Sequence, residues 1–183
     1  GIGYQMHGLV LVDAENKVVR PSIIWCDGRA VETGDRAFKG IGLDTCLAHC
    51  LNSPGNFTAA KLKWVADNEP ENYAKTKYAM LPGDYIALRL TGEATTTVTG
   101  LSEGVFWDFK EDHLAKLVLD EMGLDENKIP RQVPAVGEQG KLTAAAAKEL
   151  GLEAGTVVGY RAGDQPNNAL SLNVLAPGEV AAT

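Results

Sequence analysis

Cysteine and histidine are scarce in this sequence, and their spacing fits neither a disulfide framework nor a zinc motif. The 183 residues include three cysteines, Cys26, Cys46 and Cys50, without a CxxC pair, and three histidines that lie far apart. A sparse, odd set of cysteines is typical of reduced thiols in the cytosol. Zinc motifs need closer spacing than these histidines have. We therefore expect a cytoplasmic protein without a metal site built from these residues.

Long hydrophobic runs and an excess of positive charge are also missing. No apolar run approaches the ~18–20 residues of a membrane span. Seventeen lysines and arginines against 24 acidic residues give a net charge of −7, which disfavours nucleic-acid binding through a broad basic face. Apolar residues at 45% and charged residues at 22% are close to the globular average. The composition indicates a folded domain that binds neither membranes nor nucleic acids.

Neither end of the sequence has the pattern of a natural terminus. The chain opens inside a turn-and-strand pattern over 1–10 and closes over 178–183 on a pattern typical of the start of a strand. A strand needs a partner, so a cut strand suggests a cut domain. We expect a fragment of a longer protein; a processed chain with frayed ends is the alternative.

Short strand patterns alternate with helical patterns along the chain. Expected strands cover 9–12, 18–25, 78–81, 94–99, 105–108 and 156–160, and expected helices cover 29–38, 43–51, 58–67, 85–90, 111–122, 144–150 and 167–175. The first two strands flank a polar loop, which predicts a β-hairpin, and Pro21 predicts an edge or a bulge in its second strand. Asp27 and Thr58 are expected to cap helices. The alternation predicts an α/β or α+β fold with a mixed sheet.

The segment 159–169 carries the most chemical information. A strand pattern ends at a glycine, and Asp164 follows just before a helix, with Gln165, Asn167 and Asn168 beside it. In α/β sheets, ligands gather at the carboxyl ends of the strands. A carboxylate at this place can accept the proton of a substrate hydroxyl, and the neighbouring amides can hydrogen-bond a polyol. The alternative is that Asp164 only caps the helix.

Gln5 and His7 lie next to glycines in the segment 3–8. Both side chains can donate and accept hydrogen bonds, and glycine lets a ligand come close to the backbone. The segment therefore suits a hydroxyl-rich ligand; the alternative is a structural turn with a satisfied histidine.

Trp25, Asp27 and Arg29 bring an aromatic ring, an acid and a cation together within a short segment. Such a set can form a sugar-binding corner, or equally a helix start with a local salt bridge. The run Lys61-Leu62-Lys63 is expected to be a solvated helix face. Neither glycine-rich nucleotide fingerprint, G-x-G-x-x-G or G-x-x-x-x-G-K-[ST], occurs in the sequence.

Five segments, taken in order, resemble the FGGY carbohydrate kinases. They are Gln5-Met6-His7-Gly8; Arg20-Pro21 followed by Trp25-Cys26-Asp27-Gly28-Arg29; Phe57-Thr58-Ala59-Ala60-Lys61-Leu62; Leu81-Pro82-Gly83-Asp84-Tyr85 followed by Arg89-Leu90-Thr91-Gly92; and Gly163-Asp164. Each motif is modest alone, but five in register are specific and cover nearly the whole chain. Within the family, the sequence is most similar to the members that phosphorylate D-xylulose.

The resemblance implies part of a ribonuclease H-like domain of the actin/hexokinase/Hsp70 superfamily. Residues 1–183 are then most of the N-terminal, sugar-binding domain. A leading segment with an Asp-x-Gly-Thr phosphate loop and a C-terminal nucleotide domain are absent, so we expect the chain alone to be inactive. The implied partners are ATP with Mg²⁺ and a small-molecule sugar, and the full-length protein could form a homodimer.

The resemblance also implies roles for single residues. Asp164 takes the position of the catalytic base, which deprotonates the terminal hydroxyl of a ketose as that oxygen attacks the γ-phosphate of ATP. The implied reaction converts a ketopentose, D-xylulose, to its 5-phosphate. The positions implied to bind or flank the substrate are Met6, His7, Gln165, Asp27 and Arg29.

Four positions depart from the family pattern. Gln165 stands where Asn usually follows the base in the xylulose-specific members, and Asp-Gln is closer to the arrangement in glycerol kinases. Tyr4 stands where a small residue is usual, and Asn56 and Ala60 replace a glycine and a proline. These departures bear on the sugar more than on the reaction, so glycerol, L-ribulose or another polyol are alternatives. Two other hypotheses are a sugar-binding relative without transfer activity and an unrelated α/β domain.

Overall fold

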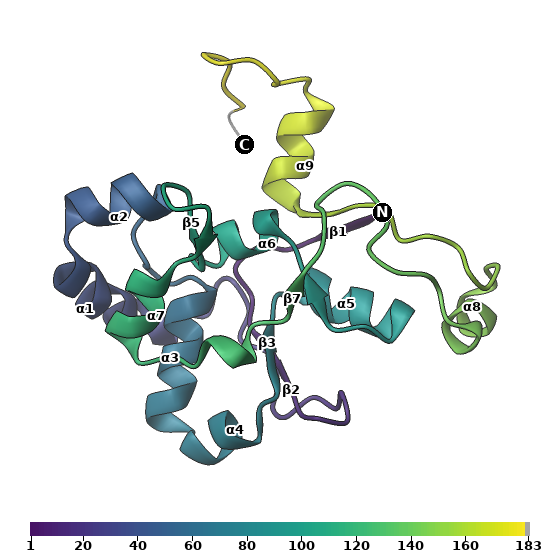
Figure 1. The fold of residues 1–183 in the computed structure, drawn as a ribbon, viewed down its shortest axis with the longest axis horizontal. Helices are drawn as coiled ribbons and strands as arrows, with labels where there is room; N and C mark the ends of the chain where they lie inside the picture. Colours follow the sequence, from purple (N-terminus) through teal and green to yellow (C-terminus); the bar gives the residue numbers. More distant parts are fainter. Residues whose placement is uncertain (182–183) are drawn as a thin grey trace.

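Short strands and helices alternate along the computed structural model, which describes residues 1–181. The strands are β1 (Ile2–Tyr4), β2 (Val10–Val12), β3 (Tyr78–Met80), β4 (Thr95–Thr96), β5 (Trp107–Asp108), β6 (His113–Leu114), β7 (Arg131–Gln132) and β8 (Arg161–Gly163). The helices are α1 (Val31–Ile41), α2 (Leu43–Cys50), α3 (Thr58–Asn68), α4 (Pro70–Lys75), α5 (Pro82–Thr91), α6 (Val98–Glu103), α7 (Lys116–Met122), α8 (Ala144–Leu150) and α9 (Asp164–Ser171), with the 3-10 turns η1 (Gly28–Ala30) and η2 (Glu126–Lys128). The predicted mixture of helices and strands is confirmed (Figure 1).

The strands pair two by two within the described residues. β1 runs parallel to β8 and β4 parallel to β7, whereas the pairs β2–β3 and β5–β6 are antiparallel. In the first pair, Ile2 lies opposite Arg161 and Tyr4 opposite Gly163. Because these strands are parallel, their carboxyl ends open at the same edge. The residues that follow β1 and those that follow β8 therefore come together.

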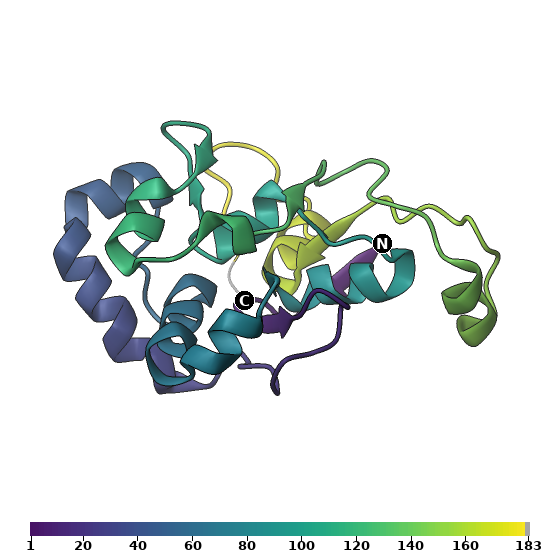
Figure 2. The same ribbon diagram turned by 60° about the horizontal axis from the view of Figure 1, so that its bottom comes forward.

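The largest hydrophobic core lies among α1, α3 and α7, which gather at one end of the molecule in both ribbon views (Figures 1 and 2). Leu62 and Val65 of α3 pack there with Val118 and Leu119 of α7. A second, smaller core joins β1 and α5 to α8, which lies at the opposite end of the molecule. The β1–β8 pair lies between these two packed regions.

The predicted hairpin forms only in part. β2 pairs along its length with β3, and the segment 18–25 reaches the 9–12 strand only through two isolated bridges, Leu9 with Ile23 and Val12 with Val18. Pro21 lies between these bridges and has no N–H to donate to a ladder. The irregularity expected at Pro21 agrees with this break in the pairing, whereas the prediction of a strand over 18–25 is wrong.

The prediction of extended structure over 94–99 is wrong beyond β4. The hydroxyl of Thr97 accepts a hydrogen bond from the Gly100 amide, at 3.1 Å, and so caps α6. Side-chain capping competes with the strand preference of threonine, and here capping wins. The formation of α6 in place of a longer strand matters because this helix ends at Glu103, beside the candidate site.

Two helix starts also differ from the prediction. Thr58 does not cap α3; it is the first helical residue, and its hydroxyl donates to the Gly8 carbonyl at 3.3 Å. Helix α7 begins at Lys116 rather than near residue 111, because residues 113–114 form β6 and pair with β5. Asp27, in contrast, caps η1 as expected, since its carboxylate accepts from the Arg29 amide.

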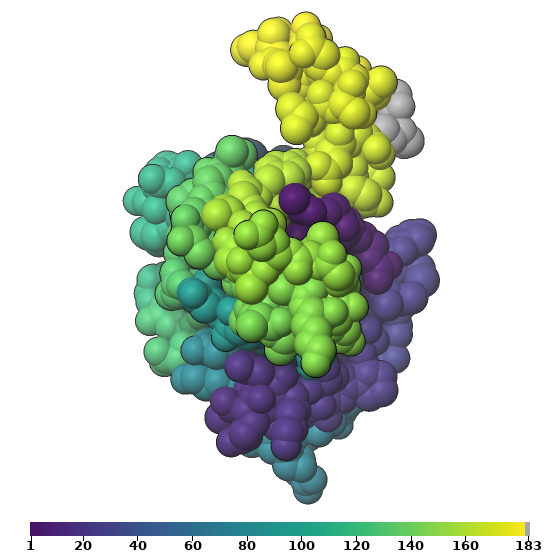
Figure 3. All heavy atoms as spheres, turned by 90° about the vertical axis from the view of Figure 1, so that its right-hand side faces the viewer, coloured from purple at the N-terminus to yellow at the C-terminus, as the bar shows by residue number. Residues whose placement is uncertain are grey.

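The last strand and helix are both displaced from their predicted positions. Residues 156–160 make only isolated bridges, and the ladder forms at β8 because that segment lies opposite β1. Helix α9 then begins at Asp164 and ends at Ser171. The expected strand at the C-terminus is absent over 178–181, and its remainder lies outside the described residues. The segment after β8, in yellow, projects from the rest of the surface (Figure 3).

His49 and Asp108 connect α2 to β5 through a part-buried ion pair. His49 Nδ1 lies 2.8 Å from Asp108 Oδ2, and Asp108 is buried. Burial raises the pKa of Asp108, but hydrogen bonds from His49 and from two backbone amides outweigh it, so the net shift is downward. We expect Asp108→Asn to lower the free energy of unfolding by about 1–3 kcal/mol at pH 7, because hydrogen bonds to a charged acceptor are lost.

The pH dependence of this effect has a definite sign. A carboxyl with a lowered pKa in the folded state stabilises the fold above its unfolded pKa of about 3.9 and loses that contribution as pH falls through the lower value. Urea unfolding from pH 7 to pH 3 should therefore show the gap between wild type and Asp108→Asn closing at the acid end. Asp35→Asn, an exposed change on α1, is the control. A gap of constant size across this range would contradict the prediction.

Candidate active site

A pocket of about 210 Å³ opens where β1 and β8 end. It is lined by Gln5, Met6, His7, Trp25, Asp164 and Gln165. Three of these follow β1 and two follow β8, so the parallel pairing of the two strands brings them together. We call this space the His7–Asp164 pocket. Of the predicted site residues, it contains Met6, His7, Asp164 and Gln165.

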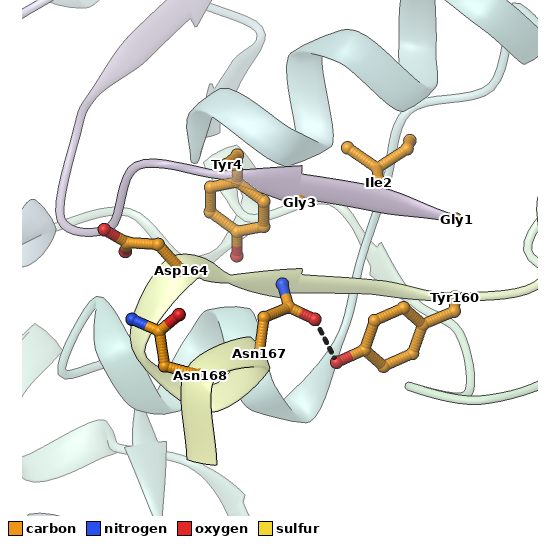
Figure 4. Close-up of a pocket in the computed structure, with 8 residues that line it drawn as sticks. All are labelled: Gly1, Ile2, Gly3, Tyr4, Tyr160, Asp164, Asn167 and Asn168. Carbon is orange, nitrogen blue, oxygen red and sulfur yellow. Dashed lines mark hydrogen bonds between the residues drawn. The ribbon is translucent and has the colours of Figure 1, made fainter. Parts of the chain in front are cut away.

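Asp164 is not the cap of the helix that it opens. The N-cap of α9 is Gly163, and Asp164 is the first helical residue, without a side-chain capping bond. The interpretation of Asp164 as only an N-cap is therefore wrong. Its carboxylate is exposed and, in Figure 4, lies beside the end of β1. The side chain is thus available to a ligand.

Asn167 fixes the start of α9 on the end of β8. Its Nδ2 donates to the carbonyls of Ala162 and Gly163, at 3.0 and 2.9 Å, and its Oδ1 accepts from the hydroxyl of Tyr160 at 2.8 Å. Figure 4 shows this contact inside a second, more open space of about 470 Å³, to which Asp164 also contributes. Asn167 was a candidate polyol ligand by sequence, but its amide is engaged with the chain itself. Its effect is to hold the first turn of α9 against the end of β8.

Gly163 permits the close approach on which this arrangement depends. A Cβ atom at this position would lie 2.2 Å from Met6 Cγ and 2.7 Å from Glu103 Oε2. Any larger residue would therefore push Met6 away from the strand end. Glycine at 163 is required by contact rather than by an unusual backbone angle.

His7 is held in one orientation by its neighbours. Its backbone lies in the left-handed region, with φ of 62°, which is uncommon for a residue other than glycine. The ring Nδ1 lies 2.9 Å from the Glu103 carbonyl, and the ring edge packs on Phe57 at 4.4 Å between centroids. Burial, aided by the nearby Lys61 ammonium, lowers the pKa of His7. A neutral ring that donates from Nδ1 keeps Nε2 as an acceptor for a ligand hydroxyl.

Asp27 and Arg29 lie outside the His7–Asp164 pocket. The Arg29 guanidinium donates to both carboxylate oxygens of Asp27, at 2.7 to 3.0 Å, and stacks 4.8 Å from the Trp64 ring centroid. These hydrogen bonds lower the pKa of Asp27 to about 2. This segment therefore forms the local salt bridge at a helix start. Of its three candidate residues, Trp25 lines the pocket. A direct role of the pair in substrate binding stays a prediction.

A layer of buried charged and polar side chains, which the sequence analysis did not identify, underlies the pocket. Arg161 is fully buried; its Nε lies 3.4 Å from Asp84 Oδ1, and its Nη2 donates to Thr95 at 3.2 Å. Burial raises the pKa of Asp84 to about 6 and that of Glu103 to about 8. Through Arg161, this layer connects β8 to α5 and to β4.

Lys61 is the second feature that the sequence analysis missed. It is fully buried, so the expectation of a solvated face is wrong at this residue, whereas Lys63 is partly exposed. The signal was present in the spacing, because Thr58, Lys61, Leu62 and Val65 follow the i, i+3, i+4, i+7 pattern of one buried helix face. A lysine within such a stripe needs a polar partner inside the protein.

The sequence as a whole matches a known family. Residues 1–171 match the model of the FGGY family of carbohydrate kinases, N-terminal domain. The chain belongs to the FGGY family of carbohydrate kinases. The resemblance carried by the five motifs is thereby confirmed.

Individual relatives agree with this assignment. The FGGY chain is 34% identical, over 175 residues, to a xylulose kinase of Streptomyces rubiginosus, covering 94% of this chain and 36% of the relative. The solved xylulose kinase of Rhodospirillum rubrum superposes with a TM-score of 0.87 at 27% identity, covering 96% of this chain and 36% of that one. A glycerol kinase of Plasmodium falciparum gives a TM-score of 0.88 at 18% identity, covering 98% and 36%, and shows likeness of fold alone.

The FGGY chain therefore spans about 36% of the length of these relatives. Their shared architecture bears out the expected ribonuclease H-like fold of the actin/hexokinase superfamily. Over residues 1–181, none of the helices is long and apolar enough to cross a membrane. The same part of the chain has no group of three His, Cys, Asp or Glu side chains placed to hold a metal ion.

Proposed function

We propose that this chain is the sugar-binding part of an ATP-dependent kinase that converts D-xylulose to D-xylulose 5-phosphate. The observation that carries the proposal is the meeting of His7 and Asp164 in one pocket, at the carboxyl ends of two parallel strands. The relatives named as xylulose kinases support the choice of sugar. Glycerol, L-ribulose or another polyol are the alternatives within the same reaction.

In this proposal, the residues after β1 bind the sugar and the residue after β8 acts on it. His7 Nε2 accepts a hydrogen bond from one hydroxyl, and Met6 and Trp25 supply apolar wall. The Asp164 carboxylate takes the proton of the terminal sugar hydroxyl. The oxygen of that hydroxyl forms a bond to the γ-phosphorus of ATP, and the bond from the γ-phosphorus to the oxygen that leaves with ADP breaks. Gln165 adjoins the base and contacts the same sugar.

The remaining parts of the reaction come from outside this chain. The described residues present no glycine-rich phosphate loop and no metal-ligand cluster, so Mg²⁺ is expected to arrive with the nucleotide as part of the substrate. In support, β1 has β8 as its only ladder partner within the described residues, which leaves an edge for further strands. We therefore propose that residues 1–183 are most of an N-terminal domain completed by a leading segment and a C-terminal nucleotide domain.

The test is release of ADP by the full-length protein that carries this domain. We expect turnover with Mg-ATP and D-xylulose to exceed that with L-xylulose, D-ribulose, L-ribulose and glycerol. A coupled assay checks this, with the 183-residue chain alone as the control that should give no turnover. Preference for glycerol would move the substrate to the alternative suggested by Gln165. Sugar binding by a folded protein without ADP release would favour a binding relative and contradict kinase activity.

A further inference from the structure

Lys61 places a fully buried ammonium group behind the His7–Asp164 pocket without a carboxylate to pair with. Its exposed fraction is 0%, and none of the ion pairs in the described part of the chain includes it. Burial lowers the pKa of Lys61 to about 8, against a weak opposing effect of Asp27 and Cys26. Burying a charged group is costly unless it is hydrogen-bonded. The hydrogen-bond partners of its Nζ atom therefore indicate the structural role of this ammonium group.

Both contacts of the ammonium are with main-chain carbonyls of loops. Lys61 Nζ donates to the carbonyl of His7 at 2.9 Å and to the carbonyl of Asn56 at 2.5 Å. His7 is the residue whose backbone has the uncommon φ of 62°. An ammonium has three donors that can rotate to meet carbonyls in different directions. Lys61 thus holds the turn after β1 against the loop before α3.

The Asn56 loop is in turn attached to the segment that brings Trp25 to the pocket. Asn56 Nδ2 donates to the carbonyl of Asp27 at 2.8 Å and, at 3.4 Å, to the carbonyl of Trp25. Trp25 and His7 both line the same pocket. One chain of hydrogen bonds therefore runs from His7 through Lys61 and Asn56 to Trp25.

We propose that Lys61 is a positioning residue that sets the separation of the His7 and Trp25 walls and so determines how tightly the sugar is held. This inference rests on the proposed function of the pocket. Lys61 is not among the residues that line the pocket, and the helix start that carries Asp164 is held separately, by Asn167. Its loss should therefore weaken sugar binding and leave the chemical step largely intact.

The experiment compares Lys61→Met with Lys63→Met in the full-length protein. Methionine keeps most of the buried volume and removes the ammonium, and Lys63, two residues along α3, makes only a surface pair with Asp67 at 2.7 Å. We expect Lys61→Met to raise KM and the sugar Kd at least about tenfold with kcat changed less than about threefold. Lys63→Met should leave both values near wild type. Tryptophan fluorescence reports sugar binding, because Trp25 lines the pocket and is 59% exposed, and loss of the change in Trp25→Phe assigns it to Trp25 rather than to Trp64 or Trp107.

A purely structural role predicts a different result. A destabilised enzyme has fewer active molecules, so kcat would fall in proportion while KM stayed constant, and that outcome would overturn the proposal. If Lys61→Met does not fold, Asn56→Ala removes the second half of the same connection from a loop and should raise KM by about threefold to tenfold. An unchanged KM in Asn56→Ala would overturn the proposal as well.

Failure of the proposed function can be told apart from failure of this inference. If the wild-type protein neither turns over nor binds any sugar of the panel, the kinase proposal fails on that result alone. Hydrogen exchange then decides on Lys61. Faster exchange in Lys61→Met over residues 5–8 and 54–57, with α5 unchanged, supports its role in holding the turn after β1 against the Asn56 loop. Exchange equal to wild type in both segments overturns it.

Discussion

Asp164→Asn should abolish most turnover of the full-length protein while leaving its sugar affinity nearly unchanged. Asparagine matches aspartate in size, and its amide can still hydrogen-bond a hydroxyl, but it cannot accept the proton that the attacking oxygen must lose. General-base catalysis contributes about 10²- to 10⁴-fold to such reactions, so kcat should fall by about that factor. The exposed position of Asp164 at the start of α9 means that little packing is disturbed.

The measurement is ADP release at saturating D-xylulose, with sugar binding followed in parallel by Trp25 fluorescence. Removing a carboxylate from the first turn of a helix costs about 0.3–1 kcal/mol through the helix dipole, so the variant should remain folded. Asp35→Asn on α1 is the matched control and should keep full activity. A kcat within threefold of wild type for Asp164→Asn would show that Asp164 is not the base.

Much of the candidate site can be predicted from the motifs in the sequence and their order. The segment after β1 and the segment after β8 were each identified as candidates, and the parallel pairing of the two strands brings His7 and Asp164 into one pocket. Local patterns alone left Asp164 open as a helix cap, because an acid before a helix serves both roles. The tertiary structure decides between them, since the cap position falls one residue earlier, on Gly163.

The supporting residues could not be predicted in the same way. Lys61 and Arg161 are charged, and charged residues are seldom fully buried unless paired, so sequence alone favours the surface. Lys61 is buried because it lies on the apolar stripe of α3, and its ammonium donates to the nearby Asn56 carbonyl and to the carbonyl of His7, 54 residues away in sequence. Thr97 caps α6 instead of extending a strand, a choice that depends on the main chain that follows it. The burial of Lys61 and Arg161 thus depends on long-range contacts, whereas the cap at Thr97 is a local choice between two structures that threonine favours.

The largest effect on stability should come from Asp84→Ala, which removes the carboxylate facing Arg161. Both side chains are almost completely buried, with exposed fractions of 1% and 0%. The guanidinium cannot release its proton near neutral pH, so the variant would bury an uncompensated positive charge. We expect the free energy of unfolding to fall by about 3–5 kcal/mol. By comparison, Glu93→Ala, which breaks the exposed pair with Arg131, should cost less than about 1 kcal/mol.

Arg161→Met should lower the free energy of unfolding less than Asp84→Ala, because an unpaired buried carboxyl can become neutral and an unpaired buried guanidinium cannot. Burial already raises the pKa of Asp84 to about 6 against the lowering effect of Arg161. Without Arg161 the carboxyl can take up a proton and become neutral, whereas Arg161 without Asp84 cannot. A carboxyl whose pKa is raised on folding stabilises the fold most below its unfolded pKa of about 3.9 and loses that contribution as pH rises through the folded value.

The stability of Arg161→Met, relative to wild type, should therefore improve as pH falls from 7 toward 4, while the deficit of Asp84→Ala should not shrink. Urea unfolding at pH 7, 6, 5 and 4 measures both differences on the same protein. The double variant Asp84→Leu with Arg161→Met should recover part of the loss, because it leaves no buried charge. Equal deficits for the two single variants at every pH would show that the cost is one of lost packing. The expected asymmetry would instead place the cost in charge burial, at Arg161 on β8, the strand that leads into Asp164.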